Sequence, residues 1–416
     1  MTTATRSPAA RALRGDRRFR RFWAGQAVSQ FGDRITELAL PLIAVTALRA
    51  STAQVAELTA LLWAPNVLAV FLGAWVDGRA DRRRLLVVAD LVRAAALASL
   101  PLAALAGAVT LGQLYAVAVV TGAAGVLFNN AYAPFFAHLV PRSAYLAANS
   151  RLSTTRSAAQ IAGPALGGAL VQALTAPVAV LVDALSFLAS ALLIGRIRGV
   201  SEAATDGEPM LSRARAGLRF VVRHPVLRAS LGCCTTVNFF TFLGYGLVLL
   251  FAGRTLGLSA GTIGAAFGLG ATGGLLGALL APAVSRRLGL GRTIVLGSVL
   301  FPAPIALLAA ADGPGWARAG VLAAAEFLSA LGVMLFDINL NSLQAAVIPD
   351  DLRSRVSGAF ATVNYGIRPL GALTGGLLAT AFGLRPALLV AAVGGALSAL
   401  WLLVSPVPRI RDLDSL

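Results

Sequence analysis

The sequence of 416 residues contains no lysine, only two cysteines and only two histidines. The cysteines, Cys233 and Cys234, are adjacent within an apolar stretch, so they form neither a disulfide framework nor a metal cluster. The histidines, His138 and His224, are far apart, and no catalytic triad, zinc-site or phosphate-loop pattern accompanies them. These absences argue against an enzyme and predict no cofactor and no bound metal.

Charge is also scarce. Charged residues make up 13% of the chain, hydrophobic residues make up 57%, and the mean hydropathy is +0.78. A soluble globular protein carries about 25% charged residues. The composition therefore predicts an all-α membrane protein, and the length leaves room for about twelve helical spans of about 20 residues each.

The formal net charge of +17 comes from arginine alone on the basic side. A charge of this size also fits a nucleic-acid-binding protein. However, the arginines recur in alternate loops between apolar runs instead of forming one patch, which is typical of a membrane topology signal. We therefore predict a lipid bilayer as the surroundings and no nucleic-acid partner.

Apolar runs predict twelve spans in two six-helix halves, joined by a polar linker. The predicted spans cover approximately residues 22–48, 55–76, 85–105, 111–136, 152–174, 177–194, 229–251, 261–284, 293–311, 317–342, 356–382 and 386–404. The predicted domains are an N-terminal tail at 1–19, a first half at 20–195, a linker at 196–227, a second half at 228–405 and a C-terminal tail at 406–416. Within the linker, residues 214–224 predict an amphipathic helix at the membrane interface, with Leu218, Val221 and Val222 on its apolar face.

The two halves carry matching landmarks. Pro141 and Pro349 are 208 residues apart, and so are the glycine pairs that begin at Gly167 and Gly375. This spacing is half of the chain length, which indicates duplication of a six-helix unit.

The arginine-rich loops set the expected orientation. One alternate set of loops, together with both tails, holds most of the arginines, and the other set holds little beyond Arg49, Arg254, Arg318 and Arg385. The positive-inside rule then predicts a multi-pass protein of the cell membrane with both termini in the cytoplasm.

The loop between the second and third predicted spans contains Gly73, Asp77 and an arginine cluster that includes Arg82 and Arg83. This pattern resembles the corresponding loop of major facilitator superfamily transporters. Two features depart from it, because Gly78 stands where that family usually has arginine and the stretch is about one residue longer. A stop-transfer arginine cluster is the alternative, but it would not account for the glycine and the aspartate.

The resemblance implies a twelve-helix major facilitator fold. It also implies that this loop helps to hold the two halves together during gating. Asp90 and Arg93, further along the third span, are typical of the drug- and siderophore-exporting branch, which includes macrolide-efflux proteins and the enterobactin exporter.

The fifth span contains Gly163, Pro164, Gly167 and Gly168. This stretch resembles the antiporter motif of exporters in the same superfamily. Small residues let a neighbouring backbone approach closely, and proline permits a kink. Ordinary glycine-mediated packing is the alternative interpretation.

Charged residues within predicted spans are the candidates for coupling, because a charge inside a bilayer costs a few kcal/mol unless it faces a cavity or a partner. The candidates are Asp33, Glu37, Asp183, Glu326 and Arg368. Asp33 is the preferred proton carrier, because it is at mid-depth in the first span with a second acid one turn away, and Glu326 is the runner-up. The sequence does not decide whether Arg368 forms an ion pair with Asp33 or with Glu37.

Together these patterns predict a secondary active transporter, a monomer, that couples protons to the efflux of a small hydrophobic or amphiphilic compound. Such a compound would be an antibiotic, another secondary metabolite or a siderophore. A proton-coupled uptake symporter is the alternative within transport. A membrane receptor or scaffold without transport is the alternative of a different class.

Overall fold

Regular structure in this protein is helical throughout the described part of the chain. The computed structural model describes residues 15–77, 79, 81–141, 144–198, 210–349 and 352–412, and no strand occurs among them. Eight of the described helical segments are long and apolar enough to cross a membrane. Many large apolar side chains lie on the outside, including Leu105, Leu279 and Leu377, which suits a lipid environment.

The first half contains six helical rods, and each overlaps a predicted span. Its elements are α2 (Arg17–Leu42), η1 (Ile43–Ala47), α3 (Thr52–Trp63), η2 (Ala64–Leu68), α4 (Ala69–Asp77), α5 (Arg82–Leu105), α6 (Leu111–Leu139), α7 (Tyr145–Leu174) and α8 (Ala176–Gly195). The helix α9 (Met210–Arg223) follows in the linker.

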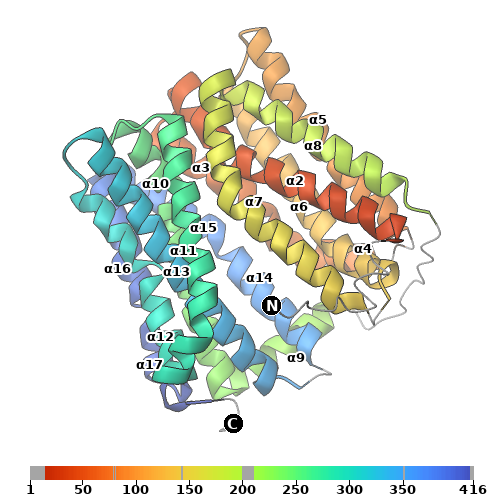
Figure 1. Ribbon diagram of the computed structural model, residues 1–416, viewed down its shortest axis with the longest axis vertical. Coiled ribbons are helices and arrows are strands. Elements are labelled where there is room, and N and C mark those ends of the chain that lie inside the picture. Colours follow the sequence, from red (N-terminus) through yellow and green to blue (C-terminus); the bar gives the residue numbers. More distant parts are fainter. Residues whose placement is uncertain are drawn as a thin grey trace, which may run out of the picture.

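The second half contains six further rods, whose arrangement can be followed in Figure 1. Its elements are α10 (Pro225–Arg254), α11 (Ala260–Leu288), α12 (Leu290–Leu300), η4 (Ala303–Ala310), α13 (Gly315–Val347), α14 (Arg353–Gly366), α15 (Arg368–Phe382), α16 (Leu384–Ala396), α17 (Ala399–Leu403) and η5 (Val407–Arg409). The prediction of twelve spans in two halves is thereby confirmed.

Several helices begin earlier than the apolar pattern indicates, because polar caps fix their first turns. The side chain of Ser51 accepts a hydrogen bond from the amide of Gln54 at 3.2 Å, and the Gln54 side chain accepts one from the amide of Ser51 at 2.7 Å. This reciprocal pair satisfies amides that the helix itself leaves unpaired. The side chains of Asp16 and Ser259 likewise accept hydrogen bonds from the first amides of α2 and α11.

Three predicted spans are broken near mid-length with a proline at the break, whereas the twelfth is divided between α16 and α17 without one. The second span changes from α3 to η2 next to Pro65, and the ninth changes from α12 to η4 next to Pro302. The eleventh is divided between α14 and α15 next to Pro369. Proline lacks an amide hydrogen and clashes with the preceding turn, so it interrupts the helical hydrogen-bond ladder.

The two halves share a hydrophobic core at one end only. We call the end that holds the start of α2 and the turn η5 the terminal side. The largest cluster of buried apolar residues combines both halves at the side opposite the termini, with members such as Leu58, Val180 and Leu250. On the terminal side each half has its own cluster, represented by Phe135 in the first and Ile294 in the second.

On the terminal side, α9 lies against the first turns of α14. A side chain at Gly217 would collide with the backbone carbonyl of Arg355, so the two helices are in close contact. Val221 of α9 is buried, whereas Leu218 and Val222 are exposed. The apolar residues predicted to share one face are therefore divided between packing on α14 and exposure to the surroundings.

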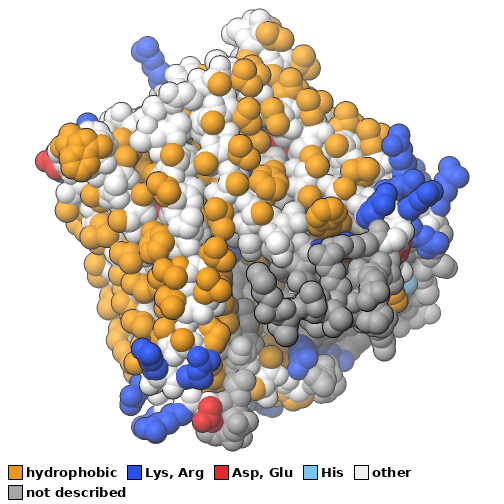
Figure 2. Space-filling view, in the orientation of Figure 1, with side chains coloured by type: hydrophobic (Ala, Val, Ile, Leu, Met, Phe, Trp, Pro, Cys, Tyr) orange, Lys and Arg blue, Asp and Glu red, His pale blue; other side chains and the backbone are white. Residues whose placement is uncertain are grey.

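Arginine side chains gather at the ends of the rods rather than along them. Figure 2 shows blue side chains at the right-hand ends of α2 and α8 and at the lower ends of α12 and α17, with apolar faces between them. This distribution matches helical rods whose middles contact lipid and whose ends reach the polar interface.

Candidate functional site

Two adjoining cavities lie between the helices. The first has a volume of about 290 Å³ and is lined mainly by the first half, and the second has a volume of about 400 Å³ and is lined by both halves. They share a wall formed by Arg34, Glu37, Pro41, Thr59 and Tyr245. A substrate-sized space at the interface of two pseudo-symmetric halves is where a membrane transporter binds its substrate.

The helix α2 contributes an ion pair to this shared wall. Arg34 donates a hydrogen bond to the carboxylate of Glu37 at 2.7 Å, and about a third of each side chain is exposed. The two residues are one turn apart on the same face of α2. Gly163 of α7 makes room for the aliphatic stem of Arg34, because a Cβ at this position would meet the Arg34 side chain.

Asp33 and Asp183 both line the first cavity. Asp183, on α8, is fully buried and accepts hydrogen bonds from Thr36 and from Ser186, the second at 2.9 Å. Gly32 permits this contact, because a side chain there would collide with Asp183. Two hydroxyl donors therefore stabilise Asp183, and no ion pair within 4.0 Å involves it among the described residues.

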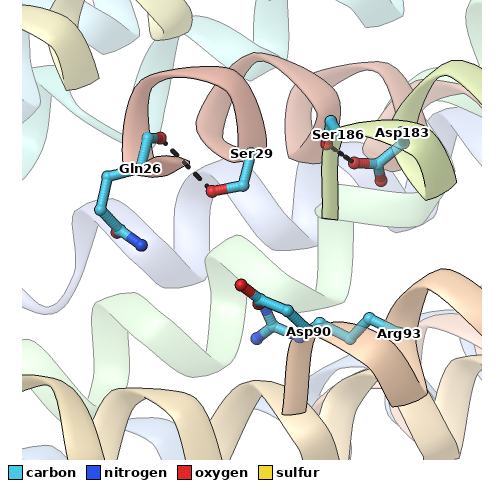
Figure 3. Close-up of polar contacts among 6 residues, drawn as sticks. All are labelled: Gln26, Ser29, Asp90, Arg93, Asp183 and Ser186. Carbon is cyan, nitrogen blue, oxygen red and sulfur yellow. Dashed lines mark hydrogen bonds and ion pairs between the residues drawn. The ribbon is translucent and has the colours of Figure 1, made fainter. Parts of the chain in front are cut away.

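Arg93 of α5 supplies positive charge next to these acids. Its guanidinium lies 3.9 Å from the carboxylate of Asp90 and 4.9 Å from the ring centroid of Phe187. The same charge acts on Asp33 and on Asp183. Figure 3 shows Asp183 on α8 beside α2, with Asp90 and Arg93 on α5 nearby. Asp90 and Arg93 therefore form an ion pair across one turn of α5.

Glu326 lines the second cavity from α13. No ion pair of this residue occurs in the described part of the chain. Its stem packs on Gly270 of α11, where any side chain would collide with the Glu326 Cβ. The close approach of α11 and α13 thus fixes the base of the Glu326 side chain.

Arg368 lies outside the lining of both cavities. Its guanidinium is 4.5 Å from the ring centroid of Trp63, 4.6 Å from that of Phe242 and 4.2 Å from that of Tyr365, and it donates a hydrogen bond to Asn238 at 3.1 Å. Aromatic faces attract a cation through their quadrupole. Arg368 therefore forms no ion pair with Asp33 or Glu37 in this conformation.

The loop motif is described in part. Gly73 is buried in α4, Arg82 is almost fully buried at the start of α5, and Arg83 donates to the carbonyl of Ile197 at 2.7 Å. The side chain of Asp77 lies outside the described part of the structure, as does Gly78. The helix α4, which ends at Asp77, packs against α9 and α14.

The glycines of the antiporter-like stretch bring α7 close to one helix of each half. Gly167 contacts the backbone of α2 at Ile35, and Gly168 contacts the backbone of α11 at Gly264. In the second half, Gly375 contacts α10 at Leu243 and Gly376 contacts α3 at Ala56. Each pair thus joins the first helix of its own half to the second helix of the other half, which explains why the repeat preserves both glycines.

Sequence reasoning missed the hydroxyl residues around the carboxylates. Thr36, Ser186 and Ser329 each follow an acidic residue by three positions within an apolar span, after Asp33, Asp183 and Glu326 respectively. Residues three apart share a helical face. This spacing is a signal that the sequence alone contained. Tyr245, which lines both cavities, carries no comparable signal.

Metal binding receives no support from the described side chains. No group of three or more histidine, cysteine, aspartate or glutamate residues in that part of the chain is arranged to hold a metal ion.

Comparisons with known proteins agree with this architecture. A sequence profile of the Major Facilitator Superfamily matches residues 22–372 and 231–415. The chain is similar to the multidrug efflux pump Tap of Mycolicibacterium fortuitum, with 29% identity over 92% of this chain and 94% of that protein.

Two solved proteins share the fold. The nucleoside transporter NupG, as a D323A mutant, matches with a TM-score of 0.73 and 13% identity, covering 93% of this chain and 99% of its own. A bacterial homologue of the iron transporter ferroportin in its inward-facing state matches with a TM-score of 0.70 and 20% identity, covering 93% of this chain and 98% of its own. A bacterial homologue of the iron transporter ferroportin in an outward-facing state with soaked iron matches with a TM-score of 0.59 and 19% identity, covering 92% of this chain and 98% of its own.

Proposed function

Because this chain belongs to the Major Facilitator Superfamily and is a membrane transporter, we propose that it exports a small amphiphilic compound and is driven by protons. The observation that carries the proposal is the second cavity, which is largely apolar, contains a few polar groups and is walled by both halves. An amphiphile gains free energy when its apolar surface leaves water. The similarity to a protein named as a multidrug efflux pump also favours export over uptake.

Alternating access would follow from the position of the shared core. The halves are joined by a common apolar cluster at the side opposite the termini, and they have separate clusters on the terminal side. If both termini lie in the cytoplasm of a cell-membrane protein, as we propose, this arrangement would be the inward-facing one. The higher TM-score against the inward-facing ferroportin homologue supports the same proposal.

The loop motif would act as a contact between the halves on the terminal side. The helix that ends at Asp77 packs against α14, and the N-terminus of a helix carries the positive end of the helix dipole. An anion is stabilised at such a helix start. We propose that Asp77 binds there when the cavity faces outward. In this proposal Gly73 allows the close packing of α4, while Arg82 and Arg83 fix the start of α5.

Protons would be carried by carboxylates of the first cavity. Asp33 and Asp183 line it without an ion pair within 4.0 Å among the described residues. A carboxylate that loses water binds a proton more readily, and nearby positive charge favours its release. Both cavities lie within one chain, so the proposal requires only a monomer.

Transport in everted membrane vesicles tests the function. With the lumen of everted vesicles that contain the protein made more acidic than the medium, we expect protons to leave in exchange for the fluorescent amphiphile Hoechst 33342, which accumulates inside, and collapse of the gradient should stop this accumulation. Vesicles without the protein are the control. Accumulation only in right-side-out vesicles would indicate an uptake symporter, and no accumulation of any amphiphile in either orientation would favour a receptor or scaffold.

Cysteine labelling tests the orientation. In a variant without Cys233 and Cys234, a single cysteine placed between residues 196 and 212 should react with an impermeant maleimide only after the membrane is opened. A cysteine placed at Arg49 or Arg318 should react in intact cells, because these residues are in the arginine-poor set of loops. Equal labelling of both sets in intact cells would contradict the proposed orientation.

A further inference from the structure

The second cavity contains polar groups that remain without protein partners. Its walls are largely apolar and include Phe240, Phe267, Phe301 and Val333. Glu326 is the one carboxylate in the described lining that has no ion pair within 4.0 Å, since Glu37 is paired with Arg34 at 2.7 Å. The only unpaired charge in the described lining is therefore the negative charge of the Glu326 carboxylate.

Two hydroxyl groups accompany Glu326. Ser329 follows it by three positions on α13, so both side chains lie on one helical face. Ser329 is only 7% exposed, and its Oγ has no hydrogen-bond partner among the described residues. Thr241 lines the same cavity from α10, and its Oγ1 is likewise buried and unpaired. A buried hydroxyl without a partner destabilises the protein, so a bound ligand that pairs with it recovers free energy.

We propose that the second cavity binds the ammonium group of a singly charged amphiphilic amine, held by Glu326 and Ser329 with Thr241 as a further acceptor. An ammonium group has three N–H donors, and these three side chains offer acceptor oxygens. One positive charge neutralises the unpaired carboxylate, whereas an anion would be repelled by it. The aromatic and aliphatic walls take the apolar body of the ligand.

This assignment separates two tasks between the two cavities. Asp33, Asp183 and Arg93 line only the first cavity, whereas Glu326 and Ser329 line only the second. Glu326 would therefore recognise the charge of the substrate instead of carrying the coupling proton. The transport role of the bound amine rests on the proposed export function, but its binding does not.

Binding of two matched probes to the purified protein in lipid nanodiscs tests the assignment. The first probe is monodansylcadaverine, which carries a primary ammonium group, and the second is its N-acetyl derivative, which is neutral. The dansyl group reports binding of both by fluorescence. A hydrogen-bonded charge pair is expected to favour the ammonium probe by roughly tenfold to a hundredfold in Kd.

Glu326→Gln should abolish this preference and leave the Kd of the neutral probe within about twofold, because the apolar walls are unchanged. Retained binding of the neutral probe also shows that the variant is folded. Ser329→Ala should weaken only the ammonium probe, by roughly threefold to tenfold. Asp337→Asn is the matched control, since Asp337 is on the same helix but lines neither cavity.

Three results would overturn the assignment: equal affinity of both probes for the unmodified protein, no binding of the ammonium probe, or an unchanged preference in Glu326→Gln. Failure of the export function gives a different result. In that case, binding would still depend on Glu326, but vesicles would accumulate neither probe on a proton gradient. Gradient-driven accumulation of both probes without any preference would instead support export and reject the amine site.

Discussion

Replacement of Asp33 by asparagine is expected to abolish uphill export while leaving substrate binding intact. For one proton exchanged per substrate, a gradient of one pH unit supports about a tenfold concentration ratio. The Asp33→Asn variant should bring this ratio to about one, because an amide cannot take up and release a proton at this position. Everted vesicles with a fixed gradient measure the ratio, and equilibrium binding to purified protein measures the retained affinity.

The reason lies in the surroundings of Asp33. Its carboxylate lines the first cavity, where the guanidinium charge of Arg93 acts on it and where Asp183 lies in the same wall. The described part of the chain gives it no ion pair within 4.0 Å. The Asp33 carboxylate can therefore take up a proton when the cavity loses water and release it when water returns.

Two further variants separate the candidate carriers. Glu37→Gln should weaken export less than Asp33→Asn does, because Glu37 is already neutralised by Arg34. Asp183→Asn keeps one acceptor oxygen where Asp183 offers two, to Thr36 and to Ser186, and tests the second acid of this cavity. If Asp33→Asn still accumulates substrate at the unmodified rate, the carrier is another carboxylate, and Asp183 becomes the first candidate.

Gly168→Ala is expected to stop transport almost completely by preventing closure at the side opposite the termini. A Cβ at this position would lie 2.6 Å from the carbonyl oxygen of Ala260 and 2.8 Å from the Cα of Gly264. Both contacts are with backbone atoms of α11, which cannot rotate away as a side chain does. The two helices must therefore separate, which favours the conformation that is open on this side.

A second helical glycine provides the control. Gly320 of α13 has no heavy atom within 4 Å of its would-be Cβ. Alanine normally stabilises a helix relative to glycine by roughly 0.5–1 kcal/mol, so Gly320→Ala should keep full transport. A single cysteine at Thr59, which lines both cavities, should become more reactive toward an external impermeant maleimide in Gly168→Ala only. Normal transport by Gly168→Ala would show that this contact does not limit the conformational change.

Several features of the protein followed from the sequence alone. The number and approximate limits of the spans were predictable because a bilayer demands about 20 apolar residues for each helix. The division into equivalent halves was predictable because the same prolines and glycines recur after 208 residues. The local pairing of Asp90 with Arg93 was also predictable, since residues three apart share a helical face.

Other features were decided by tertiary packing. Arg368 does not form the ion pair considered for it, because its guanidinium lies against three aromatic rings and Asn238. Tyr365 is close to it in sequence, but Trp63, Phe242 and Asn238 come from distant parts of the chain. The sequence also did not predict that helices break at Pro65, Pro302 and Pro369. Other prolines, such as Pro41, Pro164 and Pro282, lie within continuous helices. Proline weakens a helix at every such site, and its neighbours decide whether the helix continues.

The division of the charged residues between two cavities also required the tertiary structure. The sequence identified Asp33, Glu37, Asp183 and Glu326 as acids within predicted spans. Their positions along separate spans did not show which of them line the same cavity. Close helix contacts at Gly32, Gly163 and Gly270 determine this arrangement, because each brings one acid or its partner against a particular neighbouring helix. Burial in a span follows from local composition, whereas the partner of a buried charge depends on which helices pack together.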